Sequence, residues 1–187
     1  MDASRTTPTS MIRATLRPEL LLMVAKVYVP VLFPLTFLIG LVSLTLDERL
    51  GLGSGFLPHP TELVTAGALF AVGLGLWVFT YEQLIVRGEG SPSPTAGRTQ
   101  KLVKTGIYAW CRNPSIWGKL LGVLAVGVGL NSFSFCFIIV PLLLTVSLVE
   151  KVVRQEPQLV EIFGEEYLAY RREVPLFIPW KRFFRRP

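Results

Sequence analysis

The sequence predicts an all-α, polytopic integral membrane protein with about four membrane-spanning helices and a C-terminal amphipathic helix in the cytosol. Three observations predict this fold class. Of the 187 residues, 51% are hydrophobic and 17% are charged, whereas soluble domains carry about a quarter charged residues. Several apolar runs are long enough to cross, or nearly cross, a bilayer. Basic residues gather in alternate connections between these runs, as they do in cytoplasmic loops.

The apolar runs divide one expected domain, residues 1–187, into successive parts. Membrane spans are expected over residues 27–46, 63–85, 116–130 and 133–149, which together form a membrane region over 27–149. The remaining parts are an amphipathic lead-in over 1–26, a cytosolic loop over 87–114, and a C-terminal helix and tail over 150–187. The third run is short, because a helix rises about 1.5 Å per residue. The residues just before it are therefore expected at the level of the lipid head groups.

The basic residues also predict the orientation of the chain. The net charge is +6, and the loop after the first run holds a single basic residue, Arg49. The loop after the second run and the tail hold many more, so both are expected in the cytosol, together with both termini. These residues flank apolar runs and form no separate basic domain. A lipid bilayer is therefore an expected partner, and a nucleic acid is not.

Cysteine and histidine are too few for several kinds of site. The chain has two cysteines, Cys111 and Cys136, and one histidine, His59. No metal-ligand spacing exists, so no metal site is expected. Cys111 falls in a loop and Cys136 in an apolar run, so no disulfide is expected. No Ser-His-Asp set points to hydrolysis.

Two local patterns predict how helices pack and end. The third run carries small residues on one helix face, which favours close packing against another helix: Gly118, Gly122, Ala125 and Gly129. After the fourth run, Pro157 is expected to interrupt the helix and to lie in the first turn of a new one. That new helix is expected to end near Arg172 and to place four side chains on one face: Leu159, Phe163, Tyr167 and Tyr170.

Arg112 and Glu156 are the sharpest candidates for chemistry. Arg112 lies just before the third apolar run. A guanidinium in this position either makes bidentate hydrogen bonds to a carboxylate or phosphate, or extends to lipid phosphates as an anchor. Glu156 either binds hydroxyl or ammonium groups or is a favourable charge at a helix N-terminus. Tyr108, Tyr167 and Tyr170 either stack on a base or a sulfonium, or anchor the protein at the membrane interface.

Two ordered motifs resemble those of a known family. The stretch GIYAWCRNPSIWG is similar to the G-x-Y-x-x-x-R-[HN]-P-x-x-x-G signature of the membrane methyltransferases, which include isoprenylcysteine carboxyl methyltransferase and phosphatidylethanolamine N-methyltransferase. The upstream KLVKTG and the downstream QEPQLVEIFGEEYLAYRREVPLFIP also resemble family segments, so the likeness covers about residues 88–179 in order. Gln155 departs from the pattern, since the family has a pair of glutamates where this chain has Gln155-Glu156.

The resemblance implies an S-adenosylmethionine cofactor, held between the cytosolic end of the third span and the C-terminal helix. Arg112 and Glu156 are the catalytic residues that it implies. The positions that match the cofactor motif, with one residue just upstream, are Lys101, Gly106, Tyr108, Arg112, Asn113, Pro114, Gly118 and Glu156. The residues expected to contact the acceptor are Tyr167, Tyr170 and Arg171.

The expected function is therefore methyl transfer from S-adenosylmethionine to a lipid-like or lipidated acceptor, either a phospholipid amine or a hydrophobic carboxylate. The bacterial type of the motifs and the short chain favour a prokaryotic cytoplasmic membrane, with the active site on the cytosolic side. One alternative is a non-catalytic scaffold, which the Gln155 replacement keeps open. A less favoured alternative is an NADPH-dependent enzyme of the sterol-reductase type, which normally has a longer chain. The sequence specifies no oligomeric state.

Overall fold

A computed structural model describes residues 33–53, 55–88 and 101–178, and the regular structure of these residues is entirely helical. The expected lead-in and the first six residues of the first expected span lie outside the described residues. The elements, in chain order, are α3 (Phe33–Leu50), α4 (Thr61–Gly88), the 3-10 turn η2 (Gly106–Ala109), α5 (Ser115–Gly129), the π-helical turn η3 (Phe135–Ile139), α6 (Val140–Glu150), the π-helical turn η4 (Lys151–Gln155), α7 (Glu156–Phe163) and α8 (Glu165–Glu173).

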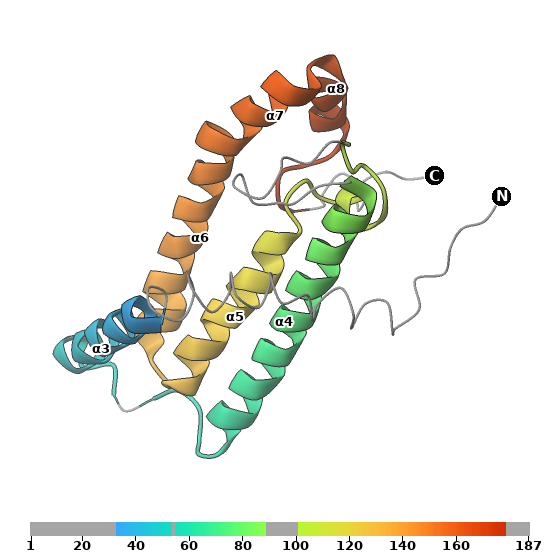
Figure 1. The fold of residues 1–187 in the computed structure, drawn as a ribbon. Coiled ribbons are helices and arrows are strands. Elements are labelled where there is room, and N and C mark those ends of the chain that lie inside the picture. Colours follow the sequence, from blue (N-terminus) through green and yellow to red (C-terminus); the bar gives the residue numbers. More distant parts are fainter. Residues whose placement is uncertain (1–32, 54, 89–100, 179–187) are drawn as a thin grey trace, which may run out of the picture.

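Helices α4 and α5 lie side by side and form the centre of the molecule (Figure 1). Both agree closely with the spans expected over 63–85 and 116–130. Their backbones approach closely because glycines meet at the crossing. A Cβ atom at Gly118 would lie 2.8 Å from the carbonyl oxygen of Gly73 and 2.8 Å from Trp77. Gly129 also faces α4, through Ala66, but a Cβ at Gly122 would meet nothing within 4 Å. A Cβ added at Gly73 would in turn lie 3.0 Å from the backbone nitrogen of Gly122, so the close approach to α4 predicted for this face is confirmed at Gly118, Gly122 and Gly129.

One continuous helical stretch runs from η3 to the end of α7, over Phe135–Phe163. Pro157 lies in the first turn of α7, as predicted, but the expected interruption before it is wrong. The π-helical turn η4 precedes the proline, and such a turn absorbs a local change of hydrogen-bond spacing without ending the helix. The ribbon accordingly leans over from α6 to α7 but does not break (Figure 1).

The break occurs later, at Gly164. Its φ of +54° lies in the left-handed region, which glycine adopts readily, and it separates α7 from α8. The single helix expected to end near Arg172 is therefore two helices. The four side chains predicted to share one face of that helix nonetheless pack together. Tyr167 and Tyr170 are buried with Val174, and three residues of α7 together with one loop residue pack against them: Leu159, Val160, Phe163 and Leu102.

Two helical stretches are long and apolar enough to cross a membrane, namely α4 and Phe135–Phe163, whereas α5 is shorter. In the most apolar 18-residue stretch of each of these helices, only 11% of the residues are buried inside the molecule. Large apolar side chains such as Phe70 and Leu142 point outward, as expected of helix faces that contact lipid. Helix α3 overlaps the first expected span but lies at an angle to the lower end of the stretch formed by η3 and α6 (Figure 1). Four spans therefore stay a prediction.

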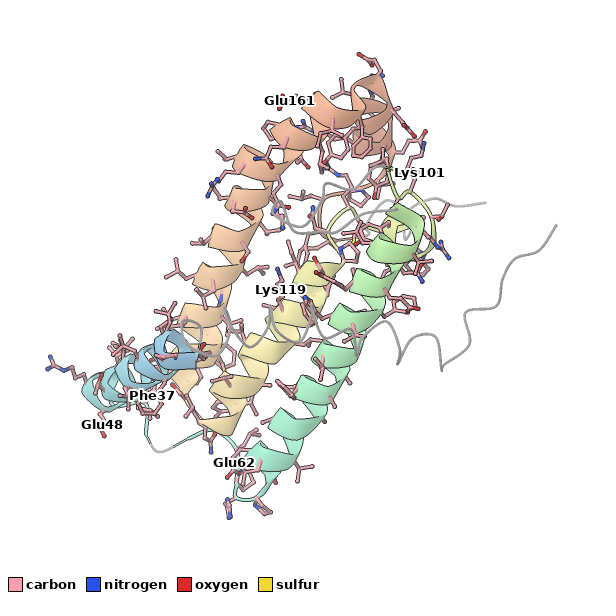
Figure 2. All side chains as sticks on the ribbon, viewed as in Figure 1. Phe37, Glu48, Glu62, Lys101, Lys119 and Glu161 are labelled. Atoms are coloured by element: carbon pink, nitrogen blue, oxygen red, sulfur yellow. The ribbon has the colours of Figure 1, made fainter. Side chains whose placement is uncertain are left out.

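Polar side chains join α3 to the turn between α5 and η3. The carboxylate of Asp47 accepts hydrogen bonds from the hydroxyl of Ser132 at 2.6 Å and from the backbone N–H of Ser134 at 2.7 Å. Asn131, with a φ of +52°, lies in the tight turn after α5 and donates to the carbonyl of Leu57 at 2.7 Å. These bonds fix one end of the helices. In Figure 2, Glu62 marks that end and Lys101 marks the other, where the candidate site lies.

Candidate active site

The segment Arg112-Asn113-Pro114 leads directly into α5. Pro114 precedes the first residue of the helix, and its φ of −65° is already helical. The backbone N–H of Arg112 donates to the carbonyl of Pro175 at 2.9 Å, and that of Asn113 donates to Leu176 at 3.2 Å. The segment after α8, residues 174–177, is therefore held against the start of α5. We call it the C-terminal strap.

Arg112 and Glu156 form a buried ion pair, although they lie 44 residues apart in the sequence. Their side chains are 9% and 4% exposed. The same Nη1 atom of Arg112 also donates to the hydroxyl of Tyr167 at 3.3 Å. On the outer side, the half-exposed Arg171 places its Nε atom 3.4 Å from the second carboxylate oxygen of Glu156. The structure thus brings together four residues that the sequence assigned to catalysis, cofactor or acceptor.

Arg112 retains a donor that nothing in the described residues satisfies. Its Nε atom is buried without a hydrogen-bond partner there. A buried donor left unpaired costs about 1–3 kcal/mol, so this site favours an incoming oxygen, and most of all an anionic one. S-Adenosylmethionine carries a carboxylate, an ammonium group and ribose hydroxyls. Arg112 fits the carboxylate, and Glu156 fits an ammonium or hydroxyl donor, so this pair suits the expected cofactor.

The three predicted tyrosines are buried in packing contacts. Tyr170 donates from its hydroxyl to the carbonyl of Tyr108 at 2.7 Å, and the Tyr108 hydroxyl donates to the carbonyl of Thr80 at 3.4 Å. Burial raises the pKa of both phenols above its usual value, which keeps them protonated as donors. Tyr167 is only 2% exposed. These tyrosines join α8, the loop and α4, and their contact with a ligand stays a prediction.

The other predicted cofactor residues are less closely grouped. Gly106 turns the chain with a φ of +65°, and a Cβ there would lie 3.2 Å from Nη1 of Arg87. Lys101 has an exposed side chain, and its backbone N–H donates to the carbonyl of Gly88 at the end of α4. Gly118 packs against α4 rather than against the Arg112–Glu156 pair. The structure gives Gly118 a packing role, and its contact with a cofactor stays a prediction.

Trp117 and the C-terminal strap were not among the predicted site residues. The indole of Trp117 stacks on the ring of Phe177, with centroids 4.3 Å apart and planes 16° apart. Its Nε1 atom donates to the carbonyl of Phe177 at 3.3 Å. The signal that could have identified the strap is the VPLFIP stretch, which belongs to the quoted downstream motif.

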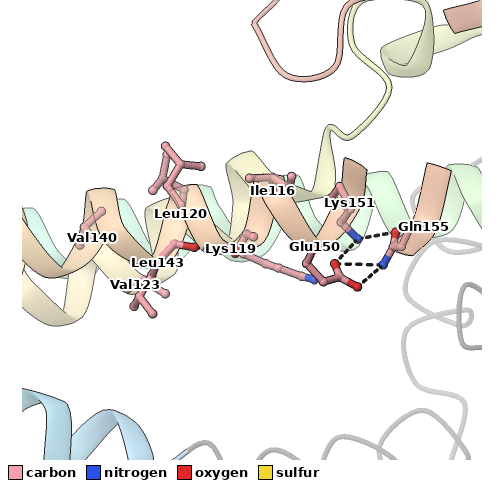
Figure 3. Close-up of a pocket in the computed structure, with 11 residues that line it drawn as sticks. Ile116, Lys119, Leu120, Val123, Val140, Leu143, Glu150, Lys151 and Gln155 are labelled. Carbon is pink, nitrogen blue, oxygen red and sulfur yellow. Dashed lines mark hydrogen bonds and ion pairs between the residues drawn. The ribbon is translucent and has the colours of Figure 1, made fainter. Parts of the chain in front are cut away.

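A cavity of about 320 Å³ lies between α5 and α6 (Figure 3). One part of its wall is apolar, and the other holds Lys119, Glu150, Lys151 and Gln155. Gln155 faces this cavity, whereas its neighbour Glu156 pairs with Arg112. None of the residues predicted to contact the acceptor, Tyr167, Tyr170 and Arg171, lines this cavity.

Comparison with known proteins identifies the class to which this fold and site belong. The family model for phospholipid methyltransferases matches residues 61–166, which is more than half of the chain. The chain therefore belongs to the phospholipid methyltransferase family. The match begins at α4 and ends within α8, so it contains both Arg112 and Glu156.

Individual relatives are similar over a shorter stretch. The chain is 34% identical to the protein-S-isoprenylcysteine O-methyltransferase of Mus musculus over 82 residues, which is 44% of this chain and 29% of the mouse protein. It is 35% identical to the protein of the same name from Schizosaccharomyces pombe over 78 residues, which is 42% of this chain and 33% of the yeast protein. The matched stretch thus spans about a third of these relatives or less.

Proposed function

We propose that this protein is a methyltransferase that works in a membrane and transfers a methyl group from S-adenosylmethionine to a lipid-like or lipidated acceptor. Membership of the phospholipid methyltransferase family and the names of its relatives support the reaction class. The observation that carries the proposal is the buried Arg112–Glu156 pair, with its unsatisfied Nε donor, at the start of α5. A prokaryotic cytoplasmic membrane, with the site on the cytosolic side, is part of the same proposal.

The residues have distinct roles in this proposal. Arg112 binds the carboxylate of the cofactor through Nε, and Glu156 accepts from its ammonium group or from ribose hydroxyls. S-Adenosylmethionine supplies a methyl group activated by a sulfonium. The ion pair and the C-terminal strap fix the side chains around it, and such positioning supplies much of the acceleration of a displacement reaction. Arg171 lies where it can balance the charge of Glu156 from the solvent side.

Calorimetry on the full chain in detergent tests the proposal. S-Adenosylmethionine and its demethylated product are titrated into wild type, Arg112→Lys and Glu156→Gln. Arg112→Lys keeps a positive charge near Glu156 but removes the Nε donor and the bidentate hydrogen-bonding geometry of the guanidinium. We expect wild type to bind and each variant to lose at least about tenfold in affinity, as for one charge-assisted hydrogen bond.

A matched control uses the exposed ion pair of the same region. Glu166 pairs with Lys104 at 2.7 Å, and its side chain is 54% exposed. Glu166→Gln makes the same chemical change as Glu156→Gln and should leave binding unchanged. Wild type that is folded yet binds neither ligand contradicts the proposal. Binding of NADPH in its place indicates a reductase, and binding of none of the three indicates a scaffold.

A further inference from the structure

Resting on the proposed function, we propose that the cavity between α5 and α6 is the acceptor site and that it selects an apolar chain with an anionic head group, which Lys119 binds. The cavity volume of about 320 Å³ lies within the usual range for small-molecule sites. The occupant is an amphiphile, because the wall divides into an apolar and a polar part.

The apolar part is supplied by aliphatic side chains of both helices. These residues are Ile116, Leu120, Val123, Val140, Leu143 and Leu144. Helix α6 presents other aliphatic side chains outward, with Leu142 59% exposed and Val146 58% exposed, as on a face that contacts lipid. An acyl or prenyl chain therefore exchanges one apolar surrounding for another when it moves from the bilayer into the cavity.

The polar part carries an excess of positive charge. Lys151 donates to Gln155 at 2.6 Å and lies 3.9 Å from Glu150, and Gln155 donates to Glu150 at 3.3 Å. Lys119 lines the same cavity, and in Figure 3 its side chain runs toward this cluster. Within the described part of the chain, Lys119 has no ion-pair or hydrogen-bond partner. Two ammonium groups therefore face one carboxylate.

This balance favours an anionic head group and disfavours an amine. Lys119 is exposed and has no carboxylate partner among the described residues, so its charge attracts an anion and repels an ammonium group. An amine acceptor must also lose a proton before it attacks. Among the described residues that line the cavity, the one carboxylate, Glu150, already accepts from Gln155. A carboxylate acceptor needs no base, because its oxygen forms the new C–O bond as the C–S bond breaks and the sulfur becomes neutral.

The cavity also lies in the right place for the reaction. Gln155 and Glu156 are consecutive, and they face the cavity and Arg112, respectively. Ile116 lines the cavity four residues after Arg112 on the same segment. The cavity and the Arg112–Glu156 pair are thus built from the same two segments, the start of α5 and the junction of η4 with α7. A carboxylate and a phosphate are the two anionic head groups to distinguish.

Photo-crosslinking on the full chain in phosphatidylcholine nanodiscs tests the inference. Three diazirine-bearing probes of equal chain length carry a carboxylate, a phosphate monoester or an amine, and mass spectrometry maps the labelled residues. We expect an anionic probe to label the aliphatic residues of the cavity, and the amine probe to label them far less. Labelling by the carboxylate alone or by the phosphate alone identifies the head group, and either result supports the site.

Variants connect the labelling to Lys119. Lys119→Gln should reduce labelling by the anionic probe about tenfold, as for loss of one charge-assisted contact. Gln155→Glu adds a negative charge and should shift the preference toward the amine probe. Lys104→Gln is the matched control, since Lys104 pairs with Glu166 and does not line the cavity. Stronger labelling by the amine, labelling outside the cavity, or no effect of Lys119→Gln overturns the inference.

Calorimetry on the same preparations separates the two proposals. If wild type binds S-adenosylmethionine but the cavity is not labelled, the acceptor site is wrong and the proposed function stands. If the cavity is labelled but no S-adenosylmethionine binds, both the methyltransferase proposal and the role of the cavity as acceptor site fail. Unchanged cofactor binding in Lys119→Gln, together with reduced labelling, supports an acceptor role for Lys119.

Discussion

The Arg112–Glu156 pair concentrates two opposite charges where water has little access. Each charge is stabilised mainly by the other, so removal of one leaves the other buried and uncompensated. We expect Glu156→Gln to lower the free energy of unfolding by about 3–5 kcal/mol. Glu166→Gln, in the exposed pair with Lys104, should lower it by about 0–1 kcal/mol. Denaturant unfolding in detergent measures both, and equal effects would contradict the buried pair.

Cys111 gives a second prediction for a single side chain. It is 3% exposed, and burial raises the pKa of its thiol to about 11. A raised pKa means that the neutral thiol predominates until the pH approaches 11, so about one thiol in a thousand is ionised at pH 8. We expect Cys111 to resist iodoacetamide at pH 8 in the folded protein and to react readily after denaturation. Mass spectrometry checks this, and rapid alkylation of the folded protein would show that Cys111 is accessible.

Individual residues were predictable from the motif, but their pairing was not. Both Arg112 and Glu156 stand out in the sequence, yet no local spacing relates two positions 44 residues apart. The contact depends on how α7 leans over the start of α5. Trp117 and Phe177 were missed for the same reason, since their stacking joins the start of α5 to the C-terminal strap.

At the level of the helices, apolar runs predicted α4 and α5 well because their ends coincide with polar or turn-forming residues. The sequence prediction failed at Pro157, which normally disfavours continuation of a helix. The π-helical turn over Lys151–Gln155 allows the helix to continue, and this turn has no simple sequence signal. The continuous helix has a functional consequence. It places Gln155 toward the cavity and Glu156 toward Arg112 within one turn.

The contact between α4 and α5 provides a test with an internal control. A methyl group at Gly118 would lie 2.8 Å from backbone atoms of α4, whereas one at Gly122 would meet nothing within 4 Å. We expect Gly118→Ala to destabilise the protein by about 1–3 kcal/mol, because the helices must move apart. Gly122→Ala, one turn later, should be neutral or stabilising by up to about 1 kcal/mol, because alanine favours helix. Thermal unfolding compares the two variants, and equal changes would rule out the close contact.

Across the whole molecule, the described residues form two ends joined by apolar helices. One end holds α3 and the Asp47–Ser132 contact, and the other holds the Arg112–Glu156 pair. Lys101, Lys104 and Arg112, which precede α5, lie at the second end, so the positive-inside rule predicts that the active site faces the cytosol. The same orientation would bring a polar cofactor from the cytosol and an amphiphilic acceptor from the bilayer to adjacent sites.

This arrangement predicts that the two ends of α4 are exposed on opposite sides of the membrane. Leu52 lies in the loop before α4 and Lys104 in the loop after it, and both side chains are exposed, whereas Cys111 and Cys136 are buried. We expect a membrane-impermeant thiol reagent to label Leu52→Cys in intact cells. It should label Lys104→Cys only in inside-out vesicles, because α4, with 28 residues, is long enough to separate the two sides. Wild type controls for the native cysteines. Labelling of both variants from one side would mean that α4 does not cross the membrane, and an opposite pattern would place the active site outside the cytosol.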